Sequence, residues 1–546
     1  MRSLSHILAR LLLFAAILGL DCFVRSSLPH TETLLAPLAS FGIAAFAVFF
    51  CLGYPKLRRL RQPLPFRWGY FAGHIVCIAL LCFESVAAAT GRESAFLNPA
   101  VLFITRAALA AASIVCLALA CIPLRRWFSL FRQTGFLWLY ATLAGAGALL
   151  LRSPLQSLWT GQYFALGRCL QTATFLAVEH LLAPILPGLD VDPAAFTIAA
   201  PNFAIFVAPA CSGLEGLGLV LVFTLAWLTY ARRELLFPRA FLLIPAALAA
   251  VWTLNILRIG TLMLIGNAGS PEIAMVGFHS QAGWIAFTLV AVAFSLATRN
   301  LAWIQRLPVS DSSVSIMPSL QIAESDLSES PAASAYLVPF LAILAASFLS
   351  RAGSGYFEWL YPLRFLAAAV TLWHYRASYR LPQLDLRCSW RAPLVGLGVF
   401  ALFLAPELWH RYLVGAADSP SPLGIGLSQL SPAGRLTWIA FRVVASVLTL
   451  PLAEELAFRG FFARRLIQRA FDRVPYLQLS ALPLLFSSIV YGLMYGKNWL
   501  PGILAGIAFA LLARSRNRLG EAVAAHATAN LLLAAWVLTR GDFGLW

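Results

Sequence analysis

Charged residues are scarce in this sequence. Asp, Glu, Lys and Arg together make up 12% of the 546 residues, whereas hydrophobic residues make up 60%. Soluble globular domains carry about 25% charged residues, so this composition excludes a soluble globular protein. Instead, apolar runs long enough to cross a hydrocarbon core of about 30 Å recur along the chain. The sequence therefore predicts an all-α polytopic membrane protein with roughly fifteen transmembrane helices in two bundles.

Acidic residues are fewer than basic ones, at 23 against 40. In a soluble protein this excess would suggest a nucleic-acid partner. Here the basic residues cluster between the apolar runs, as they do in the cytoplasmic loops of membrane proteins. We therefore expect contact with membrane lipid and no nucleic-acid partner. The clusters that mark the cytoplasmic side are residues 56–67, 125–133, 231–239, 299–306, 463–469 and 513–518.

Long polar segments are also few. Residues 307–334 are rich in Ser, Pro, Asp and Glu and hold no sustained apolar run, which predicts a cytoplasmic linker. The linker separates a membrane domain at residues 1–306 from a second one at 335–546, and no sequence repeat relates the two. The first apolar run, at residues 1–20, lacks a small-residue cleavage site, and we expect it to remain as an uncleaved helix.

One of the nine cysteines has distinctive surroundings. Cys211 follows Pro209, precedes a glycine and stands at the head of an apolar run, "FVAPACSGLEGLGLVLVF". Ser212 and Glu215 have the S-x-x-E spacing of a capping box, which predicts Ser212 as helix N-cap. Cys211 would then lie near the positive end of the helix dipole, a position that favours thiolate over thiol. The alternating stretch at residues 195–209 predicts a short extramembrane hairpin before it.

Two further polar residues fall on the same side of the membrane as Cys211. The span at about 214–230 ends in a basic cluster, so its Cys211 end is the outer one. Counting onward places Arg258 in the outer third of the next span and His279 in the loop at its outer end. A thiol, a guanidinium and an imidazole are the nucleophile, oxyanion clamp and base of acyl transfer. The alternatives are an arginine that snorkels to the headgroups and an incidental histidine.

These residues carry a family resemblance. The stretches "APACSGLEGLGL", "NILRIGTLMLIGNAG" and "GFHSQAGWIAF" resemble the Cys, Arg and His blocks of the exosortase/archaeosortase family, over roughly residues 130–300. These polytopic enzymes process C-terminal sorting signals on exported proteins. The resemblance implies that Cys211 is the nucleophile, that Arg258 stabilises developing charge and that His279 handles the proton. Many members have a basic residue where this chain has Glu215.

The second domain carries a separate polar set. Glu454 and Glu455 end an apolar span in "PLAEELAFRGFFARRL", and Arg459 lies one helical turn after Glu455. Adjacent carboxylates are costly in lipid, so they form either a site or a helix-end ion pair with Arg459. His526 and Asn530 are an i, i+4 pair on the last span. A carboxylate and an imidazole together can activate water for peptide cleavage.

This pattern resembles the intramembrane endopeptidases of the CAAX-protease and bacteriocin-processing family, over about residues 430–540. The resemblance implies Glu454 as general base, with Glu455, Arg459, His526 and Asn530 completing the site. The family's F-x-x-x-H motif should fall in "SSIVYGLMYGKNW", where Tyr491 and Tyr495 stand instead. A simple count of spans places Tyr495 at the outer end of its helix, away from Glu454, so either the segment is re-entrant or slanted, or Tyr495 is not in the site. The residues imply no metal and no cofactor, because His526 lacks a second histidine at ligand spacing.

The order of the two blocks resembles the exosortase E/protease type of fusion, which is associated with substrates carrying a C-terminal Val-Pro-Glu-Ile-Asp (VPEID) signal. It implies a bacterial inner-membrane enzyme whose first site faces the periplasm and whose partners are exported proteins with that signal. The competing classes are a transporter, which would pair charges near the bilayer midplane, and a non-catalytic scaffold for envelope assembly. The sequence leaves the oligomeric state open.

Overall fold

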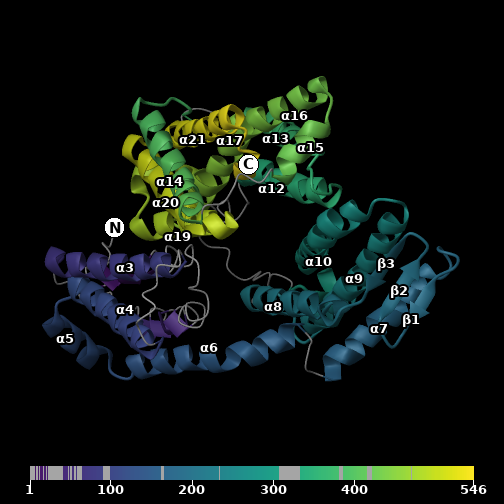
Figure 1. Cartoon of the computed structure of the whole chain (residues 1–546), viewed down its shortest axis with the longest axis horizontal. Helices are drawn as coiled ribbons and strands as arrows, with labels where there is room; N and C mark the ends of the chain where they lie inside the picture. The colour runs from purple at the N-terminus through teal and green to yellow at the C-terminus, as the bar shows by residue number, and fades with distance from the viewer. Residues whose placement is uncertain are drawn as a thin grey trace, which may run out of the picture. The chain divides into compact units, whose positions relative to one another are not determined.

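The computed structural model describes residues 64–89, 99–160, 165–306, 332–379, 385–414 and 421–546, apart from 233 and 469, together with scattered single residues before position 64. Most of these residues are helical, as predicted (Figure 1). The α-helices are α3 (Trp68–Ala89), α4 (Pro99–Cys121), α5 (Leu124–Thr134), α6 (Leu137–Thr160), α7 (Ala165–Leu182), α8 (Leu214–Tyr230), α9 (Leu243–Asn267), α10 (His279–Asn300), α12 (Ala332–Ala352), α13 (Pro362–His374), α14 (Arg391–Val414), α15 (Pro422–Gln429), α16 (Pro432–Val444), α17 (Leu450–Glu455), α18 (Ala463–Arg465), α19 (Ala481–Leu493), α20 (Trp499–Arg516) and α21 (Leu519–Arg540).

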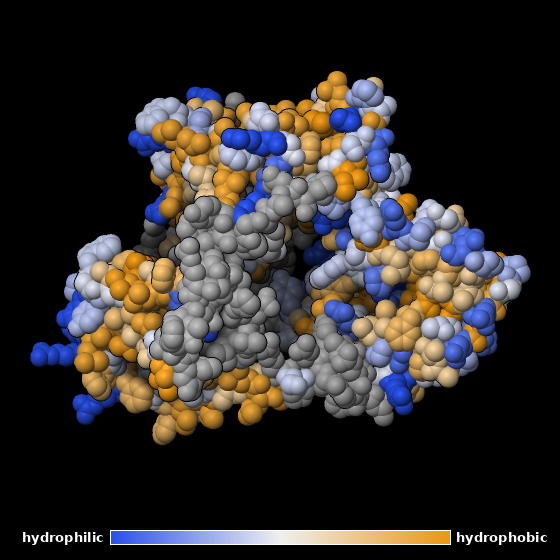
Figure 2. Space-filling view, viewed as in Figure 1, coloured by the Kyte–Doolittle hydropathy of each residue, from blue (hydrophilic) through white to orange (hydrophobic). Residues whose placement is uncertain are grey.

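Several helices are long and apolar enough to cross a membrane, which confirms the polytopic membrane class. Within the described residues they number seven, or eight if a pair of helices bent by 89° is one span. Large hydrophobic side chains such as Phe103, Leu289 and Leu341 are exposed on them, and orange covers much of the visible face in Figure 2. Lipid, which is as apolar as these side chains, accounts for their exposure. The total of roughly fifteen spans stays a prediction.

The chain forms two compact units. The first comprises Met1–Leu155, Leu402–Asp418 and Asn498–Leu500, and the second comprises Gln156–Ala401, Ser419–Lys497 and Pro501–Trp546. Most of the predicted linker, residues 307–331, lies outside the described residues, and α12 begins at Ala332. The predicted division into domains at residues 1–306 and 335–546 therefore stays a prediction.

In the first unit, α3 and α4 lie side by side (Figure 1). The basic segment at residues 125–133, which the sequence analysis treats as a loop, is the amphipathic helix α5. Helix α5 stops at Gly135, whose φ of 58° lies in the left-handed region, and α6 continues at 89° to it. The three arginines of α5 therefore belong to an amphipathic helix that can lie along a membrane surface.

The second unit contains a small sheet ahead of Cys211. Strands β1 (Asp190–Asp192), β2 (Thr197–Ala200) and β3 (Phe203–Phe206) pair antiparallel in that order. The β2–β3 hairpin, in which Thr197 lies opposite Phe206, confirms the predicted hairpin, and β1 extends it. Inward residues of the sheet pack on α7 and α9 in one core made of Phe175, Val178, Leu182, Ile198, Ile205, Val207, Ile259, Leu262, Met263 and Ala274.

Further along the same unit, a continuous helical run covers Pro432–Arg465. Two π-helical segments interrupt its α-helical geometry, η6 (Ala445–Thr449) and η7 (Leu456–Phe462). They flank α17, the short segment that ends in Glu454 and Glu455. A π-helical turn shifts the face on which later side chains lie, and such turns are frequent at functional sites.

Candidate functional sites

Cys211 lies on a tight turn that links β3 to α8. The turn is the 3₁₀ segment η1 (Pro209–Ser212), and the next residue, Gly213, has φ of +89°. A side chain at position 213 would be strained by that φ, and its Cβ would lie only 3.1 Å from Nδ2 of Asn255. Glycine is therefore required here by both conformation and space.

The predicted capping box is wrong. Helix α8 begins at Leu214 with Gly213 as its N-cap, and no side chain caps it. The 3₁₀ turn carries Ser212 inward instead, so that its side chain is fully buried and its hydroxyl has no hydrogen-bond partner among the described residues. Cys211 nonetheless lies within one turn of the helix N-terminus.

Side chains from two helices hold the backbone of this turn. The Nδ2 of Asn255, on α9, donates to the Cys211 carbonyl over 2.9 Å. The Oγ1 of Thr174, on α7, donates to the Ser212 carbonyl over 3.0 Å. Thr174 in turn accepts from Nε1 of Trp252 over 3.0 Å. These bonds fix the backbone from which the thiol projects.

Arg258 binds protein groups rather than reaching outward. Its Nη2 donates to the His279 carbonyl over 2.9 Å and lies 3.2 Å from His279 Nδ1, and its Nη1 donates to Asn255 Oδ1 over 3.3 Å. Because a guanidinium only donates, Nδ1 must accept, and a neutral His279 ring then carries its proton on Nε2. Arg258 is also within electrostatic range of Cys211 and Glu215.

The position of His279 differs from the sequence expectation. It lies not in a loop but in a helical run that covers Ile273–Asn300, at the point where the π-helical segment η3 (Ile273–Phe278) becomes α10. A helix has more rigid backbone geometry than a loop, so the imidazole is held in place by its own element as well as by Arg258.

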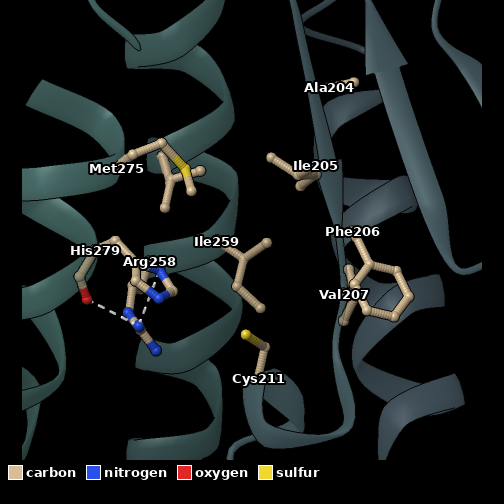
Figure 3. Close-up of a pocket in the computed structure, with 10 residues that line it drawn as sticks. Ala204, Ile205, Phe206, Val207, Cys211, Arg258, Ile259, Met275 and His279 are labelled. Atoms are coloured by element: carbon tan, nitrogen blue, oxygen red, sulfur yellow. Dashed lines mark hydrogen bonds between the residues drawn. The ribbon is translucent and has the colours of Figure 1, made fainter. Parts of the chain in front are cut away.

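One pocket of about 310 Å³ joins the three residues. Figure 3 shows the Cys211 sulfur, the Arg258 guanidinium and the His279 ring around it, contributed by the turn, α9 and α10. The rest of the wall is apolar and consists of Ala204, Ile205, Phe206, Val207, Ile259, Leu262 and Met275. An apolar pocket with a few convergent polar groups is the common form of a ligand or substrate site.

No other cysteine in the described part of the chain lines this pocket. Cys77, Cys82, Cys116 and Cys121 lie in α3 and α4, and Cys121 is buried; Cys169 and Cys388 are exposed. Cys22 and Cys51 lie outside the described residues. The contrast that the sequence predicts between Cys211 and these six therefore holds in the structure.

The second polar set also comes together. Glu455 and Arg459 are both fully buried, and Arg459 Nη1 donates to Glu455 Oε1 over 3.0 Å. His526 Nδ1 lies 3.1 Å from the same oxygen, and its Nε2 lies 3.9 Å from Glu454 Oε2. The predicted ion pair is thus formed by Glu455, whereas Glu454 Oε2 has no hydrogen bond among the described residues.

Neighbouring residues hold this set in place. Arg459 Nη2 donates to the Gly506 carbonyl over 3.0 Å, and the His526 ring stacks on Phe509 with centroids 5.1 Å apart. Asn530 Nδ2 donates to the Ser446 carbonyl, in η6, over 2.7 Å. The Asn530 amide therefore anchors α21 to η6 and is not directed at Glu454 by any described bond.

Tyr495 lies nearer to Glu454 than the simple count of spans suggests. The Tyr495 hydroxyl hydrogen-bonds the Tyr491 hydroxyl over 2.7 Å, and both tyrosines are within electrostatic range of Glu454. The Arg459 guanidinium lies over the Tyr491 ring at 4.2 Å. Tyr491 lies on the short helix α19, which ends at Leu493, and Tyr495 lies in the turn that follows, whereas counting spans assumes a full crossing.

Several residues of the two sites have no motif signal. Thr174 and Trp252 support the Cys211 turn through single hydrogen bonds, and Phe509 stacks on His526. Residue spacing in the sequence predicts none of these contacts. Asn255 is the exception, because a polar residue one turn before Arg258 in an otherwise apolar span is visible in the sequence. In the described residues no group of three or more His, Cys, Asp or Glu has metal-binding geometry, and the expected independence from metal stays a prediction.

Two family models match the chain. The model described as transmembrane exosortase (Exosortase_EpsH) matches residues 36–296, and the model described as type II CAAX prenyl endopeptidase Rce1-like matches residues 436–532. The first range contains Cys211, Arg258 and His279, and the second contains the set from Glu454 to Asn530. No curated protein and no solved structure matches the chain.

Proposed function

We propose that this chain, in which an exosortase domain is followed by a Rce1-like CAAX protease domain, is a cysteine-dependent sorting enzyme of the bacterial inner membrane. Its substrates would be exported proteins with a C-terminal signal of the VPEID type. The observation that carries the proposal is the shared pocket of Cys211, Arg258 and His279. The matches to the exosortase and CAAX protease models, together with the long apolar helices, support a membrane protease.

In the proposed reaction, the Cys211 thiolate attacks the carbonyl carbon of the scissile peptide bond. A carbon–sulfur bond forms, and the negative charge that develops on the carbonyl oxygen is stabilised by the Arg258 guanidinium. His279 takes up the proton that the Cys211 thiol loses on becoming a thiolate, and the resulting imidazolium gives a proton to the leaving amine as the carbon–nitrogen bond breaks. The resulting thioester is resolved by water or by an amine acceptor.

The proposed outer position of this site rests on charge. Helix α8 runs from the Cys211 turn to Tyr230 and leads into the basic segment at residues 231–239. Helix α10 runs from His279 to Asn300 and has Arg299 in its last turn. Basic residues mark the cytoplasmic ends of membrane helices, so the opposite ends, with Cys211 and His279, would face the periplasm.

The Arg258→Lys variant tests the role of the guanidinium. We expect processing to fall by about 10²–10³-fold, as for loss of an oxyanion donor, because an ammonium cannot reproduce three hydrogen bonds from a planar fork. The measurement is the rate of signal cleavage in membranes with equal amounts of enzyme. Arg239→Lys is the matched control, since Arg239 lies at the other end of the helix and binds only the Trp303 carbonyl in the described residues. Near-normal turnover by Arg258→Lys would contradict the clamp.

For the C-terminal domain we propose a glutamate-dependent intramembrane endopeptidase. Glu454 would take a proton from the attacking water, because its Oε2 is unoccupied by hydrogen bonds from the described residues. Glu455 would orient His526 through the 3.1 Å contact while Arg459 balances its charge. The Tyr491–Tyr495 hydroxyl pair stands where the family's histidine is missing and would supply the proton donor of this site.

A Tyr495→Phe variant tests that last role. We expect the activity of the C-terminal domain to fall by about 10²-fold or more, because a positioned proton donor contributes about that much. Tyr379→Phe is the matched control, since its hydroxyl donates to the Ala335 carbonyl over 2.6 Å and does not contact Glu454. Cleavage products that depend on the domain are quantified by mass spectrometry of membrane proteins. Equal product levels in both variants would rule out a catalytic hydroxyl at position 495.

A further inference from the structure

We propose that Asn255 is a positioning residue that couples the Cys211 turn to Arg258. This inference rests on the proposed function of the pocket. One side-chain amide bridges the two groups: Nδ2 donates to the Cys211 carbonyl over 2.9 Å, and Oδ1 accepts from Arg258 Nη1 over 3.3 Å. Among the described residues no other side chain bonds both the backbone of Cys211 and the guanidinium.

The orientation of the amide is determined by its partners. A backbone carbonyl only accepts, and a guanidinium only donates, so the Asn255 nitrogen must face Cys211 and its oxygen must face Arg258. Asparagine is costly in an apolar span unless both ends of the amide are satisfied. Asn255 is 9% exposed and lies on α9 among apolar residues, and the candidate site supplies both partners.

The guanidinium is held from two directions as a result. Asn255 Oδ1 accepts a hydrogen bond from Nη1, while the His279 carbonyl and ring Nδ1 accept from Nη2. Losing the first contact leaves Arg258 free to turn about its bond to His279. Its distance to the Cys211 sulfur would then vary, and both thiolate stabilisation and oxyanion stabilisation would weaken. The chemical step should suffer more than substrate binding, because the apolar pocket wall is unchanged.

Thr174 offers a comparison within the same turn. It holds the adjacent carbonyl, that of Ser212, over 3.0 Å but has no hydrogen bond to Arg258 in the structure. A Thr174→Val substitution therefore loosens the backbone of the turn without disconnecting it from the guanidinium. Thr253→Val serves as a control on α9 itself, because Thr253 is exposed and, among the described residues, its hydroxyl bonds only the Ala249 carbonyl of its own helix.

The experiment uses the full-length protein in native membranes and compares Asn255→Ala and Asn255→Ser with Thr174→Val and Thr253→Val. Serine keeps a polar side chain but is too short to reach both partners. Two quantities are measured: kcat and KM for a peptide ending in the VPEID signal, and the rate at which iodoacetamide alkylates Cys211, followed on the peptide that contains it.

We expect both Asn255 variants to lose about 10–100-fold in kcat, the range typical of residues that orient a catalytic group, with KM nearly unchanged. Alkylation of Cys211 should slow in parallel. Thr174→Val should lose distinctly less in both measurements, and Thr253→Val should match the unmodified protein. Equal losses for Asn255→Ala and Thr174→Val would overturn the coupling in favour of simple turn rigidity, as would wild-type kcat and alkylation in both Asn255 variants.

Alkylation separates this inference from the proposed function, because it needs no turnover. If the unmodified protein does not cleave the peptide but Asn255→Ala still slows alkylation of Cys211 relative to Thr174→Val, the coupling stands and the proposed substrate is wrong. If cleavage depends on Cys211 but the Asn255 variants have the alkylation rate and kcat of the unmodified protein, the proposed function stands and the coupling is wrong.

Discussion

Replacing Cys211 by alanine is expected to abolish cleavage of the sorting signal, with a loss of at least about 10³-fold, as for removal of a covalent nucleophile. In the described chain Cys211 alone among the cysteines lines the pocket with Arg258 and His279. The measurement follows a surface protein with a C-terminal tag after the signal, in cells in which immunoblotting shows equal enzyme in the membrane. Loss of the tag reports cleavage.

Cys169→Ala is the matched control for this prediction. Cys169 lies on α7 in the same family-model range, is exposed and does not line the pocket. Its substitution should leave cleavage at the level of the unmodified protein. The pair of variants also separates the three classes of function, because a transporter or a scaffold has no need of a thiol at position 211. Retained processing in Cys211→Ala would exclude the cysteine mechanism.

Replacing Glu454 by glutamine is expected to remove the activity of the C-terminal domain, by about 10²–10⁴-fold for loss of a general base. The same variant should leave Cys211-dependent cleavage intact. The reason is that the described bonds of Glu454, Glu455 and His526 involve α17, η7 and α21, and none involves Cys211, Arg258 or His279. The two activities are measured in one preparation. Cleavage of the sorting signal is followed as loss of the C-terminal tag, and the activity of the C-terminal domain is followed as new C-termini on membrane-protein peptides that appear with the unmodified enzyme but not with Glu454→Gln.

The control for this variant is Glu407→Gln. Glu407 forms a half-exposed ion pair with Arg411 within α14, and such pairs contribute little to stability. It should therefore retain both activities. If Glu454→Gln instead abolished cleavage at the sorting signal, in protein present at normal membrane levels, the model of two independent sites would be wrong. A sequential relay, in which one domain prepares the substrate for the other, would then be the better account.

Much of the site chemistry was visible in the sequence because polar residues are rare in lipid-spanning segments. Arg258, Glu454, Glu455, Arg459, His526 and Asn530 stand out from apolar surroundings, and each has a described bond or ion pair to a group of its own site or of an adjacent element. Pro209 and Gly213 indicate a turn around Cys211 in the sequence. In the structure Pro209 begins the 3₁₀ segment and Gly213 has a left-handed backbone conformation. Their catalytic roles stay predictions.

Other features depended on backbone geometry that no spacing rule contains. Ser212 has the sequence of an N-cap, yet it is buried in a 3₁₀ turn and Gly213 is the N-cap, so the helix begins one residue later than expected. His279 reads as a loop residue, yet a π-helical segment extends the helix back to include it. A single added residue per turn rotates every later side chain by about 100°, so errors of one residue decide which groups meet.

The sequence by itself determined the membrane class, the two blocks that match family models and most of the candidate site residues, because hydrophobicity and unusual polar residues are local properties of the chain. Only the tertiary structure decided that Tyr495 lies within electrostatic range of Glu454, that His526 contacts Glu455, and that Asn255 joins Cys211 to Arg258. These facts depend on how separate helices pack, and packing is set by the shapes of all the side chains between them rather than by any spacing along one segment.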